Sequence, residues 1–168
     1  MQKILVTGGL GFIGSNLVKL LIDKKYNVIN IDKVSYSSNY YNTKDLSKNN
    51  KYQFIKCDLK NSKKIEKTLN KFKPNCIFNL AAETHVDRSI DSPKNFIDSN
   101  ILGTFNLLEC FKKYFYKHKK GKLIHISTDE VYGDVLKGRS KEKSTYKPSS
   151  PYAASKASSD HLVTSYVK

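Results

Sequence analysis

Residues 4–17 read ILVTGGLGFIGSNL, an apolar run that opens into three spaced glycines and then continues with helical periodicity. The run predicts a buried β-strand, and the residues that follow the glycines predict an amphipathic helix. Gly8 permits a tight turn, Gly11 lets the backbone approach a ligand, and Gly14 lets the helix pack closely on the strand. Free N–H groups at the start of such a helix favour a bound pyrophosphate. The stretch therefore predicts a strand–turn–helix unit that binds a dinucleotide.

An acidic residue stands where the ribose of a dinucleotide is recognised. Asp32 closes the second apolar run, about 20 residues beyond the glycines. A carboxylate at this position repels a 2′-phosphate, which favours NAD over NADP. A lone glycine pattern can be an ordinary structural turn. The preceding strand, the following helix and Asp32 together favour a cofactor site.

Five apolar runs alternate with helical patterns along the chain. The expected strands are residues 3–7, 27–31, 52–57, 76–79 and 122–127. The expected helices are residues 12–24, 62–72, 96–117 and 151–168, the last one running to the final residue. Residues 35–51 are polar and predict a loop with a weak helix. The alternation predicts the α/β class, with right-handed crossovers that build a Rossmann-type doubly wound parallel sheet with helices on both faces. Residues 1–168 are expected to form one NAD-binding domain.

The net charge of +15 comes from 30 Lys and Arg residues against 15 acidic ones. Such an excess normally raises the question of nucleic-acid or membrane-surface binding. Arg88 and Arg139 are the only arginines, and the lysines lie in several short clusters rather than in one stripe. This distribution favours solvated faces, so we expect no nucleic-acid partner.

The first residues predict a strand rather than a signal peptide, and no apolar run is long enough to span a bilayer. Three cysteines, Cys57, Cys76 and Cys110, form no CxxC pair and stand among apolar residues. They predict reduced, buried thiols and no metal site. We therefore expect a cytoplasmic protein with no membrane partner.

Tyr152 and Lys156 form a YxxxK motif, one helical turn apart and so on one helix face. A lysine ammonium near a phenol stabilises the phenolate and lowers a pKa that is otherwise about 10. Tyr152 would then be a general base for a hydroxyl group, and Lys156 would also bond the nicotinamide ribose. YxxxK alone is common on helices. Together with the glycine turn, it indicates oxidation of an alcohol with hydride passing to NAD.

Residues 123–134 read LIHISTDEVYGD, an apolar run that ends in Thr128-Asp129-Glu130. Two adjacent carboxylates in a chain with few acids either form a solvated turn or take part in catalysis. These residues alone leave both interpretations open.

Several segments together resemble one family. TGGLGFIG is the glycine pattern of the extended short-chain dehydrogenases/reductases, and Asp32-Lys33 followed by Tyr36 and Asn39 is similar to the loop after their second strand. The longer segments are NLAAETHVDRSI at 79–90, ISTDEVYGD at 126–134 and PSSPYAASKASSDHLV at 148–163. They resemble the nucleoside-diphosphate-glucose 4,6-dehydratases of that superfamily, and the resemblance runs over the whole chain. Sister epimerases usually carry serine and small residues in place of Thr128-Asp129-Glu130.

The resemblance implies dehydration of a nucleoside-diphosphate glucose, with dTDP-glucose expected, to the 4-keto-6-deoxy sugar. Tyr152 would take the 4-OH proton while hydride moves from C4 to NAD, with Lys156 beside it. Glu130 would then remove the C5 proton, and Asp129 would protonate the departing C6 hydroxyl. Thr128 would hydrogen-bond the 4-oxygen, and hydride would return to C6.

The resemblance also implies contacts with cofactor and substrate. The expected NAD contacts are Gly8, Gly11, Phe12, Ile13, Gly14, Asp32, Lys33, Val34, Ser35, Asp58, Leu59, Leu80, Ala81, Ala82, Ser99, Tyr152 and Lys156. The expected substrate contacts are Thr84, Thr128 and the stretch from His85 to Ser89, which includes Arg88. For Arg88 a structural salt bridge is an equally good interpretation.

Family members of this kind carry a second half that completes the sheet and grips the nucleotide sugar. We therefore expect the C-terminal substrate domain to be absent from this chain, and a homodimer in the full-length form. Two alternatives stay open: a nucleotide-sugar 4-epimerase or related enzyme such as a decarboxylase, and a NAD-binding module without activity.

Overall fold

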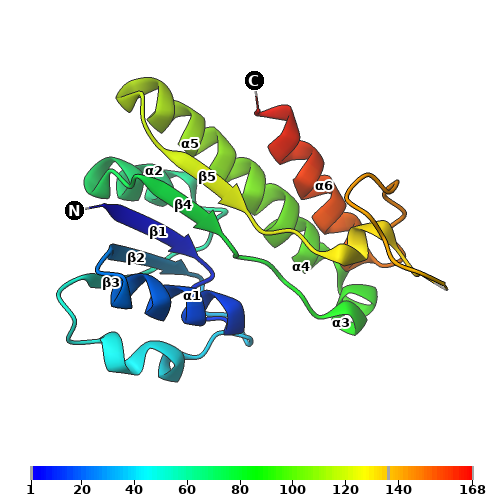
Figure 1. Ribbon diagram of the computed structural model, residues 1–168, viewed down its shortest axis with the longest axis horizontal. Coiled ribbons are helices and arrows are strands. Elements are labelled where there is room, and N and C mark those ends of the chain that lie inside the picture. Colours follow the sequence, from blue (N-terminus) through cyan, green and yellow to red (C-terminus); the bar gives the residue numbers. More distant parts are fainter. Residues whose placement is uncertain (1, 136, 168) are drawn as a thin grey trace.

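The computed structural model of the protein describes residues 2–135 and 137–167. Five parallel strands form one sheet in the order β3-β2-β1-β4-β5. The strands are β1 (Lys3–Thr7), β2 (Asn27–Asp32), β3 (Tyr52–Lys56), β4 (Cys76–Asn79) and β5 (Lys122–His125). Their carboxyl ends all point to the right in Figure 1. The predicted Rossmann-type parallel sheet is confirmed, with each strand within two residues of its expected bounds.

Strand β1 lies at the centre of the sheet because its side chains are apolar on both faces. Leu5 and Val6 are fully buried. Leu5 pairs in register with Ile29 of β2 on one side and with Ile77 of β4 on the other. Successive side chains of a strand point to opposite faces. The run ILV therefore supplies two cores at once.

Helices cover both faces of the sheet, as predicted. Helix α1 (Phe12–Asp23) and the 3₁₀ helix η1 (Tyr40–Leu46) lie on one face. Helices α2 (Ser62–Phe72) and α5 (Gly103–His118) lie on the other. Figure 1 shows α1 in front of the strands and α2 and α5 behind them. The first core contains Ile4, Val6, Val18, Leu21, Ile22, Val28 and Leu46. The second contains Leu5, Ile29, Ile31, Cys57, Leu59, Ile65, Leu69, Ile77, Leu107, Cys110 and Tyr114.

The single helix expected over residues 96–117 is instead three consecutive pieces. They are α4 (Pro93–Phe96), a π-helical segment η2 (Ile97–Leu102) and α5. The wider π turn carries the buried amide of Asn100, whose bonds are made to a distant loop rather than within the helix. Helical periodicity in the sequence did not distinguish a π segment from an ordinary helix.

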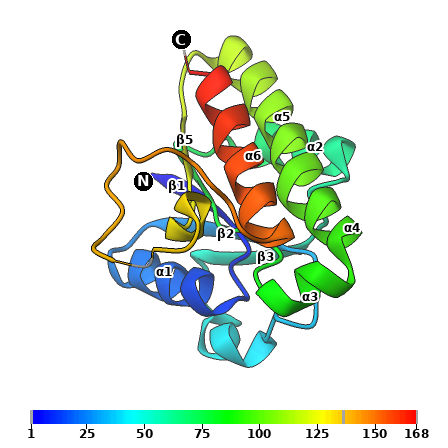
Figure 2. The same cartoon turned by 90° about the vertical axis from the view of Figure 1, so that its right-hand side faces the viewer.

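Helix α6 (Pro151–Ser165) packs beside α5, and Figure 2 shows the two side by side. Ser150 caps it, with its hydroxyl accepting from the backbone N–H of Ala153 at 3.0 Å, and Pro151 follows at the first helical position. The helix was predicted to continue to residue 168. It ends at Ser165, so the prediction is wrong for Tyr166 and Val167, and Lys168 lies outside the described residues.

Two short elements at the carboxyl edge were not predicted. Helix α3 (Val86–Asp91) follows β4, and the 3₁₀ helix η3 (Asp129–Tyr132) follows β5. Both are too short to display a hydrophobic period. They lie beyond the strand ends in Figure 1, with the loop that leads to α6. The carboxyl edge of the sheet is therefore where the candidate site must be sought.

Candidate active site

The glycine turn after β1 has no space for side chains. Gly8 has a φ of +73°, and a Cβ there would lie 2.8 Å from the backbone nitrogen of Ala81. A Cβ on Gly14 would lie 2.2 Å from the carbonyl oxygen of Gly8. Gly11 caps α1, so the first backbone N–H groups of that helix face the cleft. The turn can therefore hold an anion such as a pyrophosphate.

The carboxylate of Asp32 is oriented by three protein groups before any ligand arrives. It accepts from the backbone N–H of Leu10 at 3.1 Å, from that of Val34 at 2.8 Å and from the Ser38 hydroxyl at 2.8 Å. Val34 has a φ of +63°, which a β-branched residue rarely adopts. The strained backbone directs the Val34 N–H at the carboxylate. Asp32 thus joins the glycine turn to the loop after β2.

A cleft of about 440 Å³ runs along the carboxyl edge, from Asp32 and the glycine turn to Tyr152 and Lys156. It is lined by every residue expected to contact the cofactor except Val34, whose backbone supports Asp32. Of the expected substrate residues it includes only Thr84. It also includes residues that the sequence did not single out, namely Ile31, Ser37, Ser38, Cys57, Ile126 and Ser127. Most of these adjoin a predicted contact, which was the available signal.

Lys33 is held inside the cleft by a buried acid. Its ammonium pairs with the carboxylate of Glu83 and donates to the Ser99 hydroxyl at 2.7 Å. Glu83 is 7% exposed and follows β4, whereas Lys33 follows β2. A buried carboxylate requires such a partner, so the pair braces the two loops together. Glu83 was missed because a single acid in a loop resembles a solvated residue.

Tyr152 and Lys156 lie on one face of α6, as expected, and both are buried. Burial raises the pKa of Tyr152, hydrogen bonding from the Thr128 side chain lowers it, and the charges of Glu130 and Asp129 raise it. Burial also lowers the pKa of Lys156, against the opposite influence of Asp160. The Lys156 ammonium donates to the carbonyl of Ile126 at 2.6 Å. The expected lowering of the Tyr152 pKa is therefore wrong for this structure.

The Thr128-Asp129-Glu130 turn lies next to Tyr152. Thr128 caps η3, its hydroxyl accepting from the backbone N–H of Glu130 at 3.3 Å. Asp129 and Glu130 are both exposed, although their charges act on the Tyr152 phenol. The structure thus brings the candidate catalytic residues together, with the two acids open to solvent at the end of the cleft.

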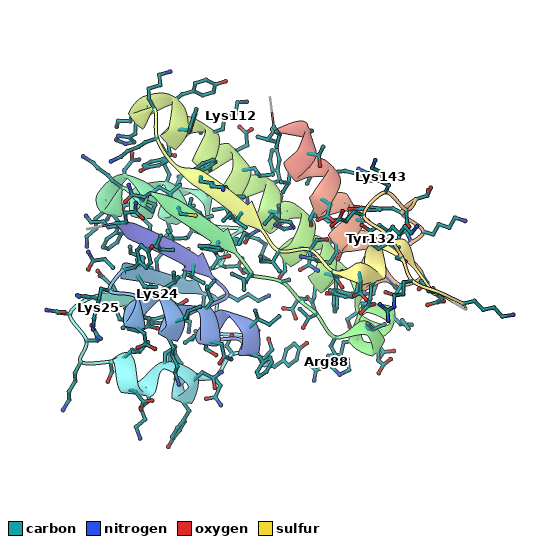
Figure 3. All side chains as sticks on the ribbon, viewed as in Figure 1. Lys24, Lys25, Arg88, Lys112, Tyr132 and Lys143 are labelled. Atoms are coloured by element: carbon teal, nitrogen blue, oxygen red, sulfur yellow. The ribbon has the colours of Figure 1, made fainter. Side chains whose placement is uncertain are left out.

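The remaining expected substrate residues lie outside the cleft. His85 and Arg88 are exposed, and the Arg88 guanidinium stacks 3.9 Å from the ring centroid of Tyr36. Arg88 makes no salt bridge within the described residues. Figure 3 shows Arg88 in the lower part of the view, right of centre and below Tyr132. The structure thus gives Arg88 an aromatic partner that neither interpretation had foreseen.

Asn100 is a site residue that the sequence did not single out within the helix expected over residues 96–117. It is 1% exposed, and its amide bonds the backbone N–H and carbonyl of Glu83 at 2.8 and 2.9 Å. The same amide donates to the Ser155 hydroxyl at 2.8 Å. Asn100 therefore fixes the loop after β4 to the middle of α6, between Tyr152 and Lys156.

Other binding classes receive little support from the described residues. No group of three His, Cys, Asp or Glu side chains among them could hold a metal ion. None of their helices has the length and apolar character needed to cross a bilayer. Figure 3 shows Lys24 and Lys25 together on the left, away from Lys112 at the top and Lys143 on the right.

The arrangement suits an elongated, anionic ligand with a reactive end. The glycine turn and Asp32 can hold a dinucleotide, and the other end presents a phenol, an ammonium and two carboxylates. A phenolate and a carboxylate can each accept a proton, and a carboxylic acid can donate one. This combination fits oxidation of an alcohol followed by removal of a proton and a leaving group.

The GDP-mannose 4,6 dehydratase family model matches residues 5–168. A dTDP-glucose 4,6-dehydratase of Neisseria meningitidis is 45% identical over 176 residues, covering 100% of this chain and 50% of the relative. The chain spans about half the length of the curated relatives it matches.

Solved structures agree with that similarity. The dTDP-glucose 4,6-dehydratase of Bacillus anthracis, solved in complex with NAD, is 40% identical with a TM-score of 0.86. The match covers 99% of this chain and 50% of that one. A Thermus thermophilus UDP-glucose 4-epimerase in complex with NAD is 33% identical, with a TM-score of 0.87, over 98% of this chain and 50% of that one.

Proposed function

The chain belongs to the GDP-mannose 4,6 dehydratase family, and on that premise we propose that it forms the NAD-binding and catalytic part of a nucleotide-sugar 4,6-dehydratase. The substrate we propose is dTDP-glucose, because the similar curated proteins carry the name dTDP-glucose 4,6-dehydratase. The observation that carries the proposal is the meeting of Tyr152 with Thr128, Asp129 and Glu130 at one end of the cleft.

NAD fits the described residues. A Cβ at Gly8 or Gly14 would collide with backbone, so glycine is required for the tight turn and for the packing of α1 on β1. Gly8, Gly11 and Gly14 line the cleft where a pyrophosphate would lie. Asp32 is buried and already oriented, and it would accept hydrogen bonds from the adenosine ribose. NAD, when bound, supplies a hydride acceptor for the sugar C4 and later a donor for C6.

Tyr152, Glu130 and Asp129 would each transfer a different proton. Tyr152 would take the proton of the 4-OH while Thr128 holds the 4-oxygen. Oxidation at C4 makes the C5 hydrogen acidic, and Glu130 would remove it. Asp129 would protonate the C6 hydroxyl, which leaves as water. The buried ammonium of Lys156 would favour the ionised form of the phenol once it is free of the Ile126 carbonyl.

Binding and product identity test this function separately. Calorimetry with NAD⁺ measures whether the cleft takes the cofactor. Mass spectrometry after addition of dTDP-glucose then measures whether the product has lost one water. A product of unchanged mass with inverted C4 would favour the 4-epimerase alternative, against which Asp129 and Glu130 argue.

A second candidate is a NAD-binding module without turnover. The observation in its favour is that the chain spans about half of its curated relatives. The exposure of both acids also leaves the sugar end without a cover from the described residues. NAD⁺ binding with no binding of dTDP-glucose in the same calorimeter would support this candidate.

We also propose a homodimer as the working state of the complete protein. Three large apolar side chains in η2 and the first turn of α5 are exposed: Ile97 at 52%, Leu102 at 42% and Phe105 at 41%. Exposed apolar groups gathered on one helix suit a second copy. Sedimentation should give a dimer that Phe105→Glu converts to monomer, whereas Tyr116→Glu at the far end of α5 should leave it intact. We place the protein in the cytoplasm, consistent with its three free cysteines.

A further inference from the structure

A chain of buried polar contacts runs beneath the cleft from β1 to α6. The backbone N–H of Ala81 donates to the Thr7 hydroxyl at 3.2 Å, and that hydroxyl donates to the Asn79 side chain at 2.6 Å. The Asn79 amide lies 3.0 Å from Nδ1 of His125. The other ring nitrogen of His125 lies 3.6 Å from Oδ1 of Asp160.

The directions of these hydrogen bonds determine which nitrogen of His125 carries the proton. The Thr7 oxygen accepts from Ala81, and the Thr7 hydroxyl donates its proton to Oδ1 of the Asn79 amide. The NH₂ of Asn79 must then donate to Nδ1, which leaves the proton of a neutral ring on Nε2. Burial lowers the pKa of His125 to about 4, so the ring is neutral at pH 7. The Nε2–H therefore faces the carboxylate of Asp160.

The second oxygen of Asp160 holds two other segments. The Ser127 hydroxyl donates to Oδ2, and the Tyr146 hydroxyl donates to the same oxygen at 3.0 Å. Ser127 directly precedes Thr128-Asp129-Glu130, and Tyr146 lies in the loop that leads to α6. Asp160 itself is one helical turn beyond Lys156 and is mostly buried, with 12% of its side chain exposed.

We infer that Asp160 is a positioning residue, whose carboxylate ties the exit of β5 and the loop before α6 to the helix that carries Tyr152 and Lys156. Its importance for catalysis rests on the proposed function. Two other contacts join the same region to α6 and the loop before it: the Lys156 ammonium bonds the Ile126 carbonyl at 2.6 Å, and Tyr132 packs edge-on against Tyr146. The charge of Asp160 also acts directly on both Lys156 and His125.

Asp160→Asn tests the inference because it removes the charge and keeps the shape. Asp134→Asn is the matched control, because Asp134 accepts from Ser149 at 3.1 Å in the same loop region and, among the described residues, makes no hydrogen bond or ion pair with α6. Backbone amide exchange of residues 127–133 and 139–150 is measured by mass spectrometry. We expect about ten-fold faster exchange in Asp160→Asn, from the loss of a charge-assisted hydrogen bond, and no such change in Asp134→Asn. Equal exchange in wild type and Asp160→Asn would overturn the inference.

A spectroscopic readout separates positioning from a general loss of structure. Ring ¹⁵N shifts of His125 should give an unprotonated Nδ1 and a protonated Nε2 at pH 7. Ser127→Ala keeps the charge of Asp160, so the ring pKa should stay near its wild-type value, while Asp160→Asn should lower it further. A proton on Nδ1, or an equal ring pKa in wild type and Asp160→Asn, would contradict the proposed contact.

The effect of Asp160→Asn on catalysis is measured by comparing its kcat and its KM for dTDP-glucose with those of the wild type. Asp160→Asn should lower kcat by about ten-fold, because displaced catalytic groups lose productive geometry, with KM and NAD⁺ affinity unchanged. An unchanged kcat would confine Asp160 to a structural role and overturn the inference. NAD⁺ binding by the wild type is measured on the same samples. If it is absent while the exchange difference persists, the proposed function fails and the tie to α6 stands.

Discussion

The two ends of the cleft differ in how much of each is already built. At the cofactor end, Gly8, Gly14 and Asp32 are fixed by backbone contacts and by hydrogen bonds of 2.8 to 3.1 Å. At the catalytic end, Asp129 and Glu130 are exposed, and Lys156 bonds a backbone carbonyl rather than Tyr152. The cofactor end is preorganised for its ligand. The catalytic end brings its side chains together but leaves both carboxylates exposed to solvent.

The difference follows from how each end is assembled. The cofactor end comes from one strand–turn–helix unit and the end of the adjacent strand, so local geometry decides it. The catalytic end needs the exits of β4 and β5, the π segment and the start of α6 to meet. Contacts between distant segments depend on the whole fold. Variants that affect one end of the cleft and spare the other therefore test whether the two ends are assembled independently.

Tyr152→Phe should have the largest effect and should be confined to the catalytic end. It removes one oxygen from a buried ring that packs edge-on against Phe96 at 6.3 Å. We expect oxidation of the sugar C4 to slow by about 10²- to 10⁴-fold, because the general base is lost. NAD⁺ affinity should not change. NADH absorbance in a single turnover measures the rate, with the exposed Tyr116→Phe as control. Wild-type oxidation by the Phe variant would remove Tyr152 from the mechanism.

Gly14→Ala should damage the cofactor end. Its Cβ would lie 2.2 Å from the Gly8 carbonyl, so strand and helix must separate. We expect a loss of about 3 kcal/mol in the free energy of unfolding and, from the displaced turn, about 100-fold in NAD⁺ affinity. Urea melts and calorimetry measure the two losses.

Gly138→Ala is the control for that variant. Gly138 has a φ of +85° but open space around its Cβ. It should lose only about 1 kcal/mol, from backbone conformation alone, and should bind NAD⁺ normally. Equal NAD⁺ affinities in the Gly14 and Gly138 variants would show that close packing at the turn is not needed for binding.

Acid should weaken the junction between the two ends through His125. The pKa of the His125 ring is about 6.5 in the unfolded chain, and burial lowers this pKa to about 4 in the folded chain. Between these values the unfolded state binds more protons, so stability falls as the pH is lowered from 6.5 to 4. The loss contributed by this ring is about 3 kcal/mol at most. Urea melts across this range measure it. The same slope in His125→Gln would assign the loss to other groups.

Asp32→Asn should affect the cofactor end more gently. The new amide can still accept at one oxygen, but its NH₂ faces a backbone donor such as the Leu10 N–H. We expect about ten-fold weaker NAD⁺ binding, from the loss of a charged acceptor for the ribose. Asp45→Asn is the control, because Asp45 is exposed and lies 3.8 Å from Lys19. Unchanged affinity in Asp32→Asn would exclude Asp32 from ribose binding.

Arg88→Ala should have the smallest effect on the fold. The variant loses an exposed stack on Tyr36, worth about 0.5 to 1 kcal/mol. Thermal melts measure this, and NAD⁺ affinity should be unchanged. Binding of dTDP-glucose is the informative readout, since its loss in Arg88→Ala would return Arg88 to the substrate-binding role.

The sheet and its cofactor end were predictable because local patterns define them. The apolar runs predicted the five strands. The glycine spacing and Asp32 predicted where the cleft lies. The α3 and η3 segments could not be predicted, since four to six residues show no hydrophobic period. The π segment was predicted as ordinary helix, because both present similar apolar faces.

The catalytic end was predictable in its members but not in its contacts. YxxxK and the two acids named residues that the structure places near one another, and their roles in catalysis stay predictions. The burial that raises the pKa of Tyr152, the bonds of Asn100 and the Lys33–Glu83 pair all depend on residues far apart in sequence. Contacts between residues so far apart cannot be derived from the spacing of residues within a motif.

We expect this cleft to direct NAD-dependent loss of water from a nucleotide sugar. The most direct measurement is the mass and deuterium content of the product formed from dTDP-glucose with NAD⁺ in D₂O. We predict a product lighter by one water, with solvent deuterium at C5, where Glu130 removes the proton. A product of unchanged mass, or no conversion by a chain that binds NAD⁺ and dTDP-glucose, would contradict the claim.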